Sequence, residues 1–394
     1  METEWIRRQV LEEIELSEEN DDEQLKKRIE EKVWEYAKEH LISLEKEQQY
    51  VQEIFYSLRK LDVLEELLQD DSVTEIMVNG YRNIFYEKQG RLYEWDKQFS
   101  GKEKLEDVIQ KIVAKNNRVV NEAMPIADAR LEDGSRIHIV LEPVAIDGSC
   151  ITIRKFPKEV MTMERLLEYK TLNEPIAEFL EKLTVAGYNI FILGGTGSGK
   201  TTFLNALSGY IPKTERIITI EDSAELQLKG VKNLIRLETR NANVKGMTEI
   251  TIRDLIRAAL RMRPDRIIVG ECRGAEALDM LQAMNTGHDG SLSTGHANSC
   301  EDMLRRLETM VLMGMELPVT AIRAQIASGV DILVHVGRMR DGSRKLMNVM
   351  EVAGYEKEQI LLNPIWQIEG GGWKRLGRLE HTQKLERAGF GILS

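Results

Sequence analysis

The run GGTGSGKT at residues 194–201 constrains the fold of this chain more than any other feature, because it fits the pattern G-x-x-x-x-G-K-[ST]. The apolar run at 188–193 predicts a buried strand leading into it, and residues 202–207 predict the first turns of a helix. Glycines permit a tight turn whose backbone N–H groups point inward, and the N-terminus of the helix adds partial positive charge. The predicted phosphate loop consists of Gly194, Gly195, Thr196, Gly197, Ser198, Gly199, Lys200 and Thr201, with Thr202 following in the helix.

Two side chains of this run have the chemistry that a nucleoside triphosphate requires. Lys200 is expected to reach the β- and γ-phosphates, and the Thr201 hydroxyl is expected to ligate Mg²⁺. The alternative is a glycine-rich turn that binds nothing. Because every motif position and both flanks are in register, phosphate binding is the better interpretation.

The charge of the chain is acidic and unevenly distributed. Residues 1–60 contain 17 acidic and 10 basic side chains, and the whole chain has a formal net charge of −11. This balance argues against a general nucleic-acid binder, although it leaves room for a local basic groove.

The scattered positions of Cys150, Cys272 and Cys300 indicate a reducing compartment, and neither a signal peptide nor a membrane span is expected from the sequence.

The pattern along the chain predicts several domains. Residues 1–60 are expected to form a charged helical segment, either a small bundle that docks on a partner or a solvated helical face. Residues 61–155 predict an α+β domain, with a hairpin turn at Asp133-Gly134, and residues 156–173 predict a linker. From 174 to 394, apolar strands alternate with helices, which is typical of an α/β domain with a mostly parallel sheet, here with a C-terminal β-ribbon and helix.

Acidic residues follow two of the predicted strands. Glu271 ends the apolar run 266–270, where a Walker B acid beside Mg²⁺ is expected. Glu221, Asp222 and Glu225 follow the strand 217–220, and carboxylates at this end of a parallel sheet face the ligand crevice. One of them could orient or deprotonate the attacking water. The alternative is that these acids cap the next element of structure.

Two histidines flank a further short strand. His288 and His296 lie in the run TGHDGSLSTGHANS, where a histidine could contact the γ-phosphate and report its presence. The structural alternative is that Ser299 and Asp302 form a capping box, with His296 filling space beside it.

The motifs GGTGSGKTT, TIEDSAE, RPDRIIVGE and TGHDGSLSTGHANS occur in this order. Together they resemble the secretion-ATPase superfamily, which drives type II and type IV secretion and pilus assembly. The upstream runs SVTEIMVNG, DARLEDGSR and ITIRKF are similar to those of the CpaF branch, the ATPases of tight-adherence (Flp) pili. The resemblance covers residues 60–394. It implies a RecA-like P-loop ATPase domain preceded by an α+β N-terminal domain.

The resemblance also implies roles for residues. Glu225 would be the catalytic glutamate, with Glu221 as its rival, and Glu271 would be the Walker B acid. His296 would be the residue of the histidine box, with His288 as a second candidate. Arginines that the N-terminal domain supplies would complete the site: Arg136, Arg154 and, third, Arg130. The sequence departs from the family at Gly295, where leucine is usual.

The resemblance implies a ring hexamer that binds ATP and Mg²⁺. The N-terminal domain would hinge on the ATPase domain, and the ring would be cytoplasmic and dock peripherally on an inner-membrane platform protein, without nucleic acid. Three alternatives remain: a kinase or GTPase switch, a DNA-pumping conjugation motor, and a nucleotide-sensing scaffold. The sequence lacks the Asn-Lys-x-Asp motif that recognises guanine, which argues against the GTPase alternative.

Overall fold

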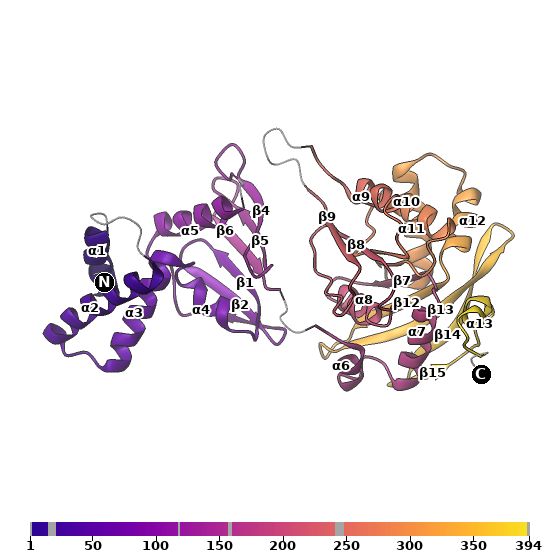
Figure 1. Ribbon diagram of the computed structural model, residues 1–394, viewed down its shortest axis with the longest axis horizontal. Coiled ribbons are helices and arrows are strands. Elements are labelled where there is room, and N and C mark those ends of the chain that lie inside the picture. Colours follow the sequence, from indigo (N-terminus) through magenta and orange to yellow (C-terminus); the bar gives the residue numbers. More distant parts are fainter. Residues whose placement is uncertain (1, 15–20, 117–118, 157–159, 241–247, 392–394) are drawn as a thin grey trace. The chain divides into compact units, whose positions relative to one another are not determined.

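A computed structural model describes residues 2–14, 21–116, 119–156, 160–240 and 248–391 (Figure 1). The chain divides into two compact units, residues 1–158 and 159–394. Pro157, which was expected to open a linker, lies outside the described residues. No single helix in the described part of the chain is both long and apolar enough to span a membrane; the pair 300–314 and 319–329 meets that requirement only jointly, with a 119° bend between them.

The first unit combines a helical bundle with an α+β domain. Its elements are α1 (Glu2–Ile14), α2 (Asp22–His40), α3 (Leu44–Arg59), α4 (Leu64–Gln69), β1 (Val73–Asn79), β2 (Asn83–Lys88), β3 (Arg91–Glu94), α5 (Lys102–Lys115), β4 (Ile126–Arg130), β5 (Arg136–Val140) and β6 (Cys150–Arg154). The strands form one sheet in the order β3-β2-β1-β6-β5-β4. Apolar and polar residues alternate along β1, β4, β5 and β6, so one face packs on the core with α4 and α5 while the other carries the polar side chains.

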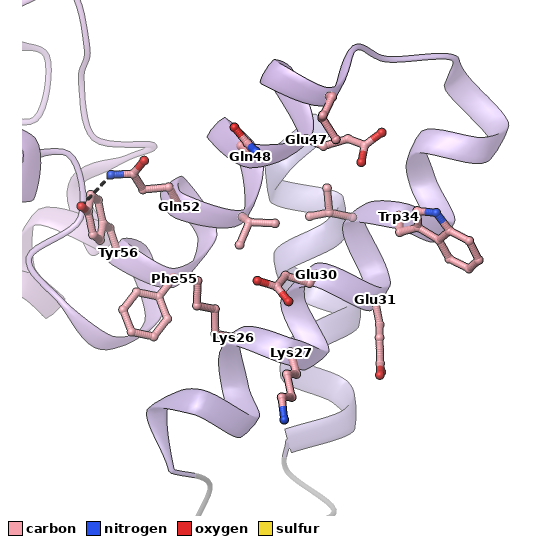
Figure 2. Close-up of a pocket in the computed structure, with 13 residues that line it drawn as sticks. Lys26, Lys27, Glu30, Glu31, Trp34, Glu47, Gln48, Gln52, Phe55 and Tyr56 are labelled. Carbon is pink, nitrogen blue, oxygen red and sulfur yellow. Dashed lines mark hydrogen bonds between the residues drawn. The ribbon is translucent and has the colours of Figure 1, made fainter.

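The helices α1, α2 and α3 pack around a small apolar core that includes Ile6, Ile29 and Ile54. A groove of about 980 Å³ lies beside them, and Figure 2 shows Lys26 and Lys27 at one end of it and Glu47 at the other. The charged helical segment expected at residues 1–60 therefore contains a three-helix bundle in its described part.

The second unit contains the phosphate-loop run. Its elements are α6 (Met163–Glu168), α7 (Glu174–Val185), β7 (Ile190–Gly194), α8 (Lys200–Ser208), β8 (Ile217–Glu221), β9 (Leu234–Glu238), α9 (Ile252–Ala259), β10 (Arg266–Val269), α10 (Glu276–Asn285), β11 (Leu292–His296), α11 (Cys300–Gly314), α12 (Val319–Gly329), β12 (Ile332–Arg338), β13 (Arg344–Glu356), β14 (Gln359–Glu369), β15 (Gly372–Arg375) and α13 (Gln383–Arg387). One sheet runs in the order β15-β14-β13-β12-β7-β11-β10-β8-β9.

The six strands from β12 to β9 pair in parallel, and β13, β14 and β15 extend the sheet as an antiparallel ribbon. Strands β7, β8 and β10 are buried along their whole length, because helices cover both faces. One core contains Ile190 and Ile192 with α6, α7 and α8, and the other contains Phe191 and Leu193 with α9 to α12. The segment for which a linker is expected carries α6, whose Met163 and Leu166 are buried in the first of these cores.

Candidate nucleotide site

The phosphate-loop run connects the end of β7 to the start of α8, as the sequence predicts. The Cβ of any side chain at Gly194 would lie 2.2 Å from the Val336 carbonyl oxygen and 2.5 Å from the Ser198 hydroxyl oxygen. Gly199, which precedes the helix, has a φ of 90°, a left-handed conformation that glycine adopts at little cost. Close approach and backbone geometry therefore require glycine at these two positions.

Gly194→Ala should lower the free energy of unfolding of the protein by about 3 kcal/mol, because the added methyl group would overlap backbone of β12 that cannot move away freely. Gly195→Ala is the matched control, since a Cβ there has no heavy atom within 4 Å. Denaturant unfolding of both variants without nucleotide measures the difference. Equal stabilities would contradict the close packing of the loop against β12.

Lys200 lies at the centre of the site. The residue is only 7% exposed, and its Nζ donates a hydrogen bond to the Gly195 carbonyl at 3.0 Å. Burial lowers the pKa of Lys200, while the carboxylate of Glu271 acts in the opposite direction. The Nζ atom also lies 3.3 Å from Nδ1 of His296, which connects the loop to the end of β11.

His296 connects Lys200 to Glu271. Its Nε2 lies 2.9 Å from Oε1 of Glu271, while its Nδ1 faces the lysine. Because an ammonium group only donates, Nδ1 must be the acceptor, and a neutral His296 then carries its proton on Nε2, toward the carboxylate. Burial lowers the pKa of His296 and so favours this neutral form.

The ends of β10 and β11 are held together beside this chain of contacts. The Thr294 hydroxyl donates to the Gly270 carbonyl at 2.7 Å, and the Cys272 amide donates to the Thr294 carbonyl at 2.9 Å. The unusual Gly295 also has a physical reason, because the thioether of Met303 occupies the space that a side chain would need. These contacts position Glu271 and His296 next to each other.

Glu221 and Glu225 differ in their surroundings. Glu221 is 3% exposed, and its Oε1 accepts hydrogen bonds from the amides of Glu225 and Leu226 at 2.8 and 3.0 Å. Burial raises the pKa of Glu221. Glu225 is half-buried and lies on the irregular segment that Glu221 holds in place. Glu221 thus braces the backbone that presents Glu225.

Sequence reasoning missed Arg273. Its Nη2 lies 2.7 Å from Oε2 of Glu271 and its Nη1 lies 3.5 Å from Oδ2 of Asp222, so it connects the acids that follow β10 and β8. The hydrogen bond to Glu271 raises the pKa of Arg273. The sequence feature that could have indicated Arg273 is a basic residue two positions after the acid that follows a predicted strand.

The residues at this edge fit Mg²⁺ bound to a nucleotide. Oε1 of Glu271 is buried and lies 2.9 Å from Nε2 of His296, and a carboxylate oxygen beside one donor can still accept a hydrogen bond from a magnesium-bound water. Thr201 is half-buried at the start of α8. Magnesium in such sites takes one or two protein oxygens together with phosphates and waters, so no larger cluster of acids is required.

The structure places the second histidine candidate away from this edge. His288 precedes β11 and therefore lies at the opposite edge of the sheet from Gly194, with its Nδ1 3.3 Å from the Ala283 carbonyl oxygen. As a candidate for the histidine box it is wrong, because the length of β11 separates it from the loop.

The three arginine candidates of the first unit lie side by side. Arg130 pairs with Arg136 and Arg136 pairs with Arg154 across β4, β5 and β6, so all three share one face of the sheet. This is the polar face, since the neighbouring residues Ile137 and Ile153, which point to the opposite face, are buried in the core. The row concentrates positive charge at one end of the sheet within its own unit.

Comparison with known proteins identifies relatives over most of the chain. Residues 57–351 match the sequence profile of a family described as "Type II/IV secretion system protein". A Mycobacterium tuberculosis protein described as a conjugal transfer protein is 34% identical and covers 78% of this chain and 89% of its own. The type IV secretion system protein PtlH of Bordetella pertussis is also 34% identical, over 74% of this chain and 93% of its own.

Two solved structures share the architecture. The Legionella pneumophila ATPase DotB has a TM-score of 0.53 at 21% identity, over 73% of this chain and 79% of its own. The pilus retraction motor PilT with bound ADP has a TM-score of 0.53 at 18% identity, over 84% of this chain and 87% of its own. These similarities confirm the expected RecA-like α/β fold.

Proposed function

This chain belongs to the type II/IV secretion system protein family, and we propose that it is an ATP-hydrolysing motor of a pilus-assembly or secretion machine. The observation that carries the proposal is the continuous set of contacts from Lys200 through His296 to Glu271, beside a glycine loop at the start of a helix. Such an arrangement places positive charge and a carboxylate that could hold a metal ion at one point, as phosphoryl transfer requires, with a neutral imidazole between them. The branch we propose is the CpaF type of tight-adherence pili, because of the upstream motifs of residues 72–80, 128–136 and 151–156.

The proposed site assigns one role to each residue. Backbone N–H groups of the loop hold the phosphates, and Lys200 contacts the β- and γ-phosphates. Thr201 and Glu271 would hold Mg²⁺, which neutralises charge on the phosphates when it is bound. Glu225 orients the attacking water and accepts its proton, while Glu221 holds the segment that carries Glu225. His296 contacts the γ-phosphate, since it already adjoins Lys200.

We further propose that the protein works as a hexameric ring in the cytoplasm, docked peripherally on an inner-membrane platform protein. Closure of the first unit on the second would bring Arg154 and Arg136 to the nucleotide, where they would stabilise charge on the transferring phosphoryl group. A local change of charge would thereby be converted into a domain movement.

Arg154→Ala should lower kcat of the assembled ring by about tenfold to a hundredfold, less than the 10³ to 10⁵ of a lone arginine finger, because Arg136 remains beside it. ATP binding by the isolated chain should be retained. Arg91→Ala, on the edge strand β3, is the matched control. Mixing Arg154→Ala chains with Lys200→Ala chains should restore activity if the arginine acts on a neighbouring subunit; no rescue would contradict the action in trans.

The experiment that tests the motor itself is a mass measurement with and without a non-hydrolysable ATP analogue, together with ATPase turnover at increasing protein concentration. A ring whose specific activity rises with assembly is expected. A monomer whose turnover is independent of concentration would contradict the proposal.

A second candidate is a DNA-translocating conjugation motor, because relatives from Mycobacterium tuberculosis and Rhizobium radiobacter are described as conjugal transfer proteins. The acidic net charge of −11 argues against it. Stimulation of ATPase activity by DNA, lost at higher salt, would favour this candidate over the pilus motor.

A further inference from the structure

The hairpin formed by β12 and β13 lies directly against the phosphate loop. Strand β12 pairs in parallel with β7, and the Val336 carbonyl occupies the space next to Gly194. Across the hairpin, Val336 pairs with Leu346, and both are buried in the core that contains Phe203 and Leu204 of α8. This face of the hairpin is therefore the face that α8 covers.

Two arginines continue that face at the edge of the sheet. Arg338 and Arg344 are two residues beyond Val336 and Leu346 and pair with each other, and the side-chain period of a strand puts them on the same face. At this edge α8 begins and the phosphate loop turns. Both side chains are exposed.

Arg344 contacts the loop itself. Its Nε donates to the Gly197 carbonyl at 3.4 Å, and its Nη1 donates to the Gly342 carbonyl at 3.1 Å. Its Cγ lies 3.6 Å from the position that a Cβ of Gly199 would take. The guanidinium group is thus held beside the loop by two backbone carbonyls.

Among the described residues, no ion pair is recorded between either arginine and an acidic side chain. Like charges directly opposite each other on a β-ribbon destabilise it. Asp341 is the only acid between residues 338 and 345, and its Oδ1 accepts hydrogen bonds from the amide and hydroxyl of Ser343 at 2.9 and 2.7 Å. An anion beside Arg338 and Arg344 would remove the repulsion, and the nearest expected anion is the one in the phosphate loop.

We propose that Arg338 and Arg344 bind the nucleotide on the side of its α- and β-phosphates. The strand order is β12-β7-β11-β10, so the hairpin flanks β7 on the side away from His296 and Glu271. Those two residues mark the side of the γ-phosphate and Mg²⁺. The arginine pair therefore contacts the part that ATP and ADP share. This inference rests on the proposed nucleotide site and adds to it two residues that no sequence motif indicated.

The test is the affinity of the full chain for fluorescent analogues of ATP and ADP in the presence of Mg²⁺. Arg338→Ala and Arg344→Ala should each raise Kd by about tenfold for both nucleotides, the value of one charge-assisted hydrogen bond to phosphate. In steady-state ATP hydrolysis, KM should increase by a larger factor than kcat decreases. Arg344→Lys should restore part of the affinity, because lysine keeps the charge but cannot bridge both carbonyls.

Arg340→Ala is the matched control, since Arg340 lies in the turn of the same hairpin and has no recorded contact with the loop. If Kd for Arg338→Ala and Arg344→Ala equals that of the control, the proposal is overturned. A loss confined to ATP, or a loss in kcat alone, also overturns it, because either result would place the arginines at the γ-phosphate.

Lys200→Ala measured in parallel separates this proposal from the one on which it rests. Loss of binding in Lys200→Ala with normal binding in both arginine variants would leave the nucleotide site standing and remove only the arginine pair. Normal binding in Lys200→Ala would remove the nucleotide site itself. Without nucleotide, Arg338→Ala and Arg344→Ala should unfold at the temperature of the unsubstituted protein or slightly above it, because the side chains are exposed and each substitution removes the repulsion between the two charges.

Discussion

Lys200→Ala is expected to lower ATP hydrolysis by at least about a thousandfold, which in a steady-state assay is loss of activity. The side chain is buried beneath the loop, with its Nζ 3.0 Å from the Gly195 carbonyl oxygen and 3.3 Å from Nδ1 of His296. Removing it takes away the charge that would face the β- and γ-phosphates. It also leaves His296 without the donor that sets its tautomer.

The control for this variant is Lys374→Ala, because Lys374 is an exposed lysine of β15 that pairs with Glu369. It should hydrolyse ATP at the rate of the unsubstituted protein. Turnover of Lys200→Ala at that same rate would refute the assignment of residues 194–201 as the phosphate loop.

Glu225→Gln is expected to keep ATP binding and to lower kcat by about 10² to 10⁴, the contribution of a general base. The glutamine keeps the size of the side chain but cannot accept a proton from water. Glu221→Gln should lower kcat less, because its amide oxygen can still accept the hydrogen bonds from the Glu225 and Leu226 amides. Nucleotide affinity and single-turnover hydrolysis, measured on both variants, separate binding from chemistry.

The reverse order, with Glu221→Gln inactive and Glu225→Gln active, would assign the base to Glu221. Glu221→Ala adds a further measurement, since it removes the acceptor for two backbone amides and should lower the free energy of unfolding by about 2 kcal/mol. A stability equal to that of the unsubstituted protein would contradict the bracing role of Glu221.

Local patterns predicted most of the second unit. The apolar run before Gly194 forms β7, and the apolar run 266–270 contains β10, which covers its first four residues. Such predictions succeed where a buried strand consists of consecutive apolar residues and is followed directly by a glycine or an acidic residue. The edge strand β9, whose residues are only half-buried or exposed, lacks that signal and was not predicted.

The roles of individual acids and histidines could not be predicted in the same way. Spacing treats Glu221 and Glu225 alike, yet one carboxylate is bonded to backbone amides and the other lies half-buried beyond it. The same holds for His288 and His296, which flank one strand and therefore lie at opposite edges of the sheet. Arg273 was missed because its partners, Glu271 and Asp222, follow different strands.

The sequence by itself determined the strand–loop–helix unit at residues 190–208 and the edge of the sheet at which Glu271 and His296 lie. Both follow from local physics, since glycine sets the turn and parallel strands with helical connections end at one edge. Only the tertiary structure decided which side chains meet there. Arg344 is far from Gly197 in the chain and reaches it because β12 pairs with β7, and a pairing between distant segments leaves no local pattern to read.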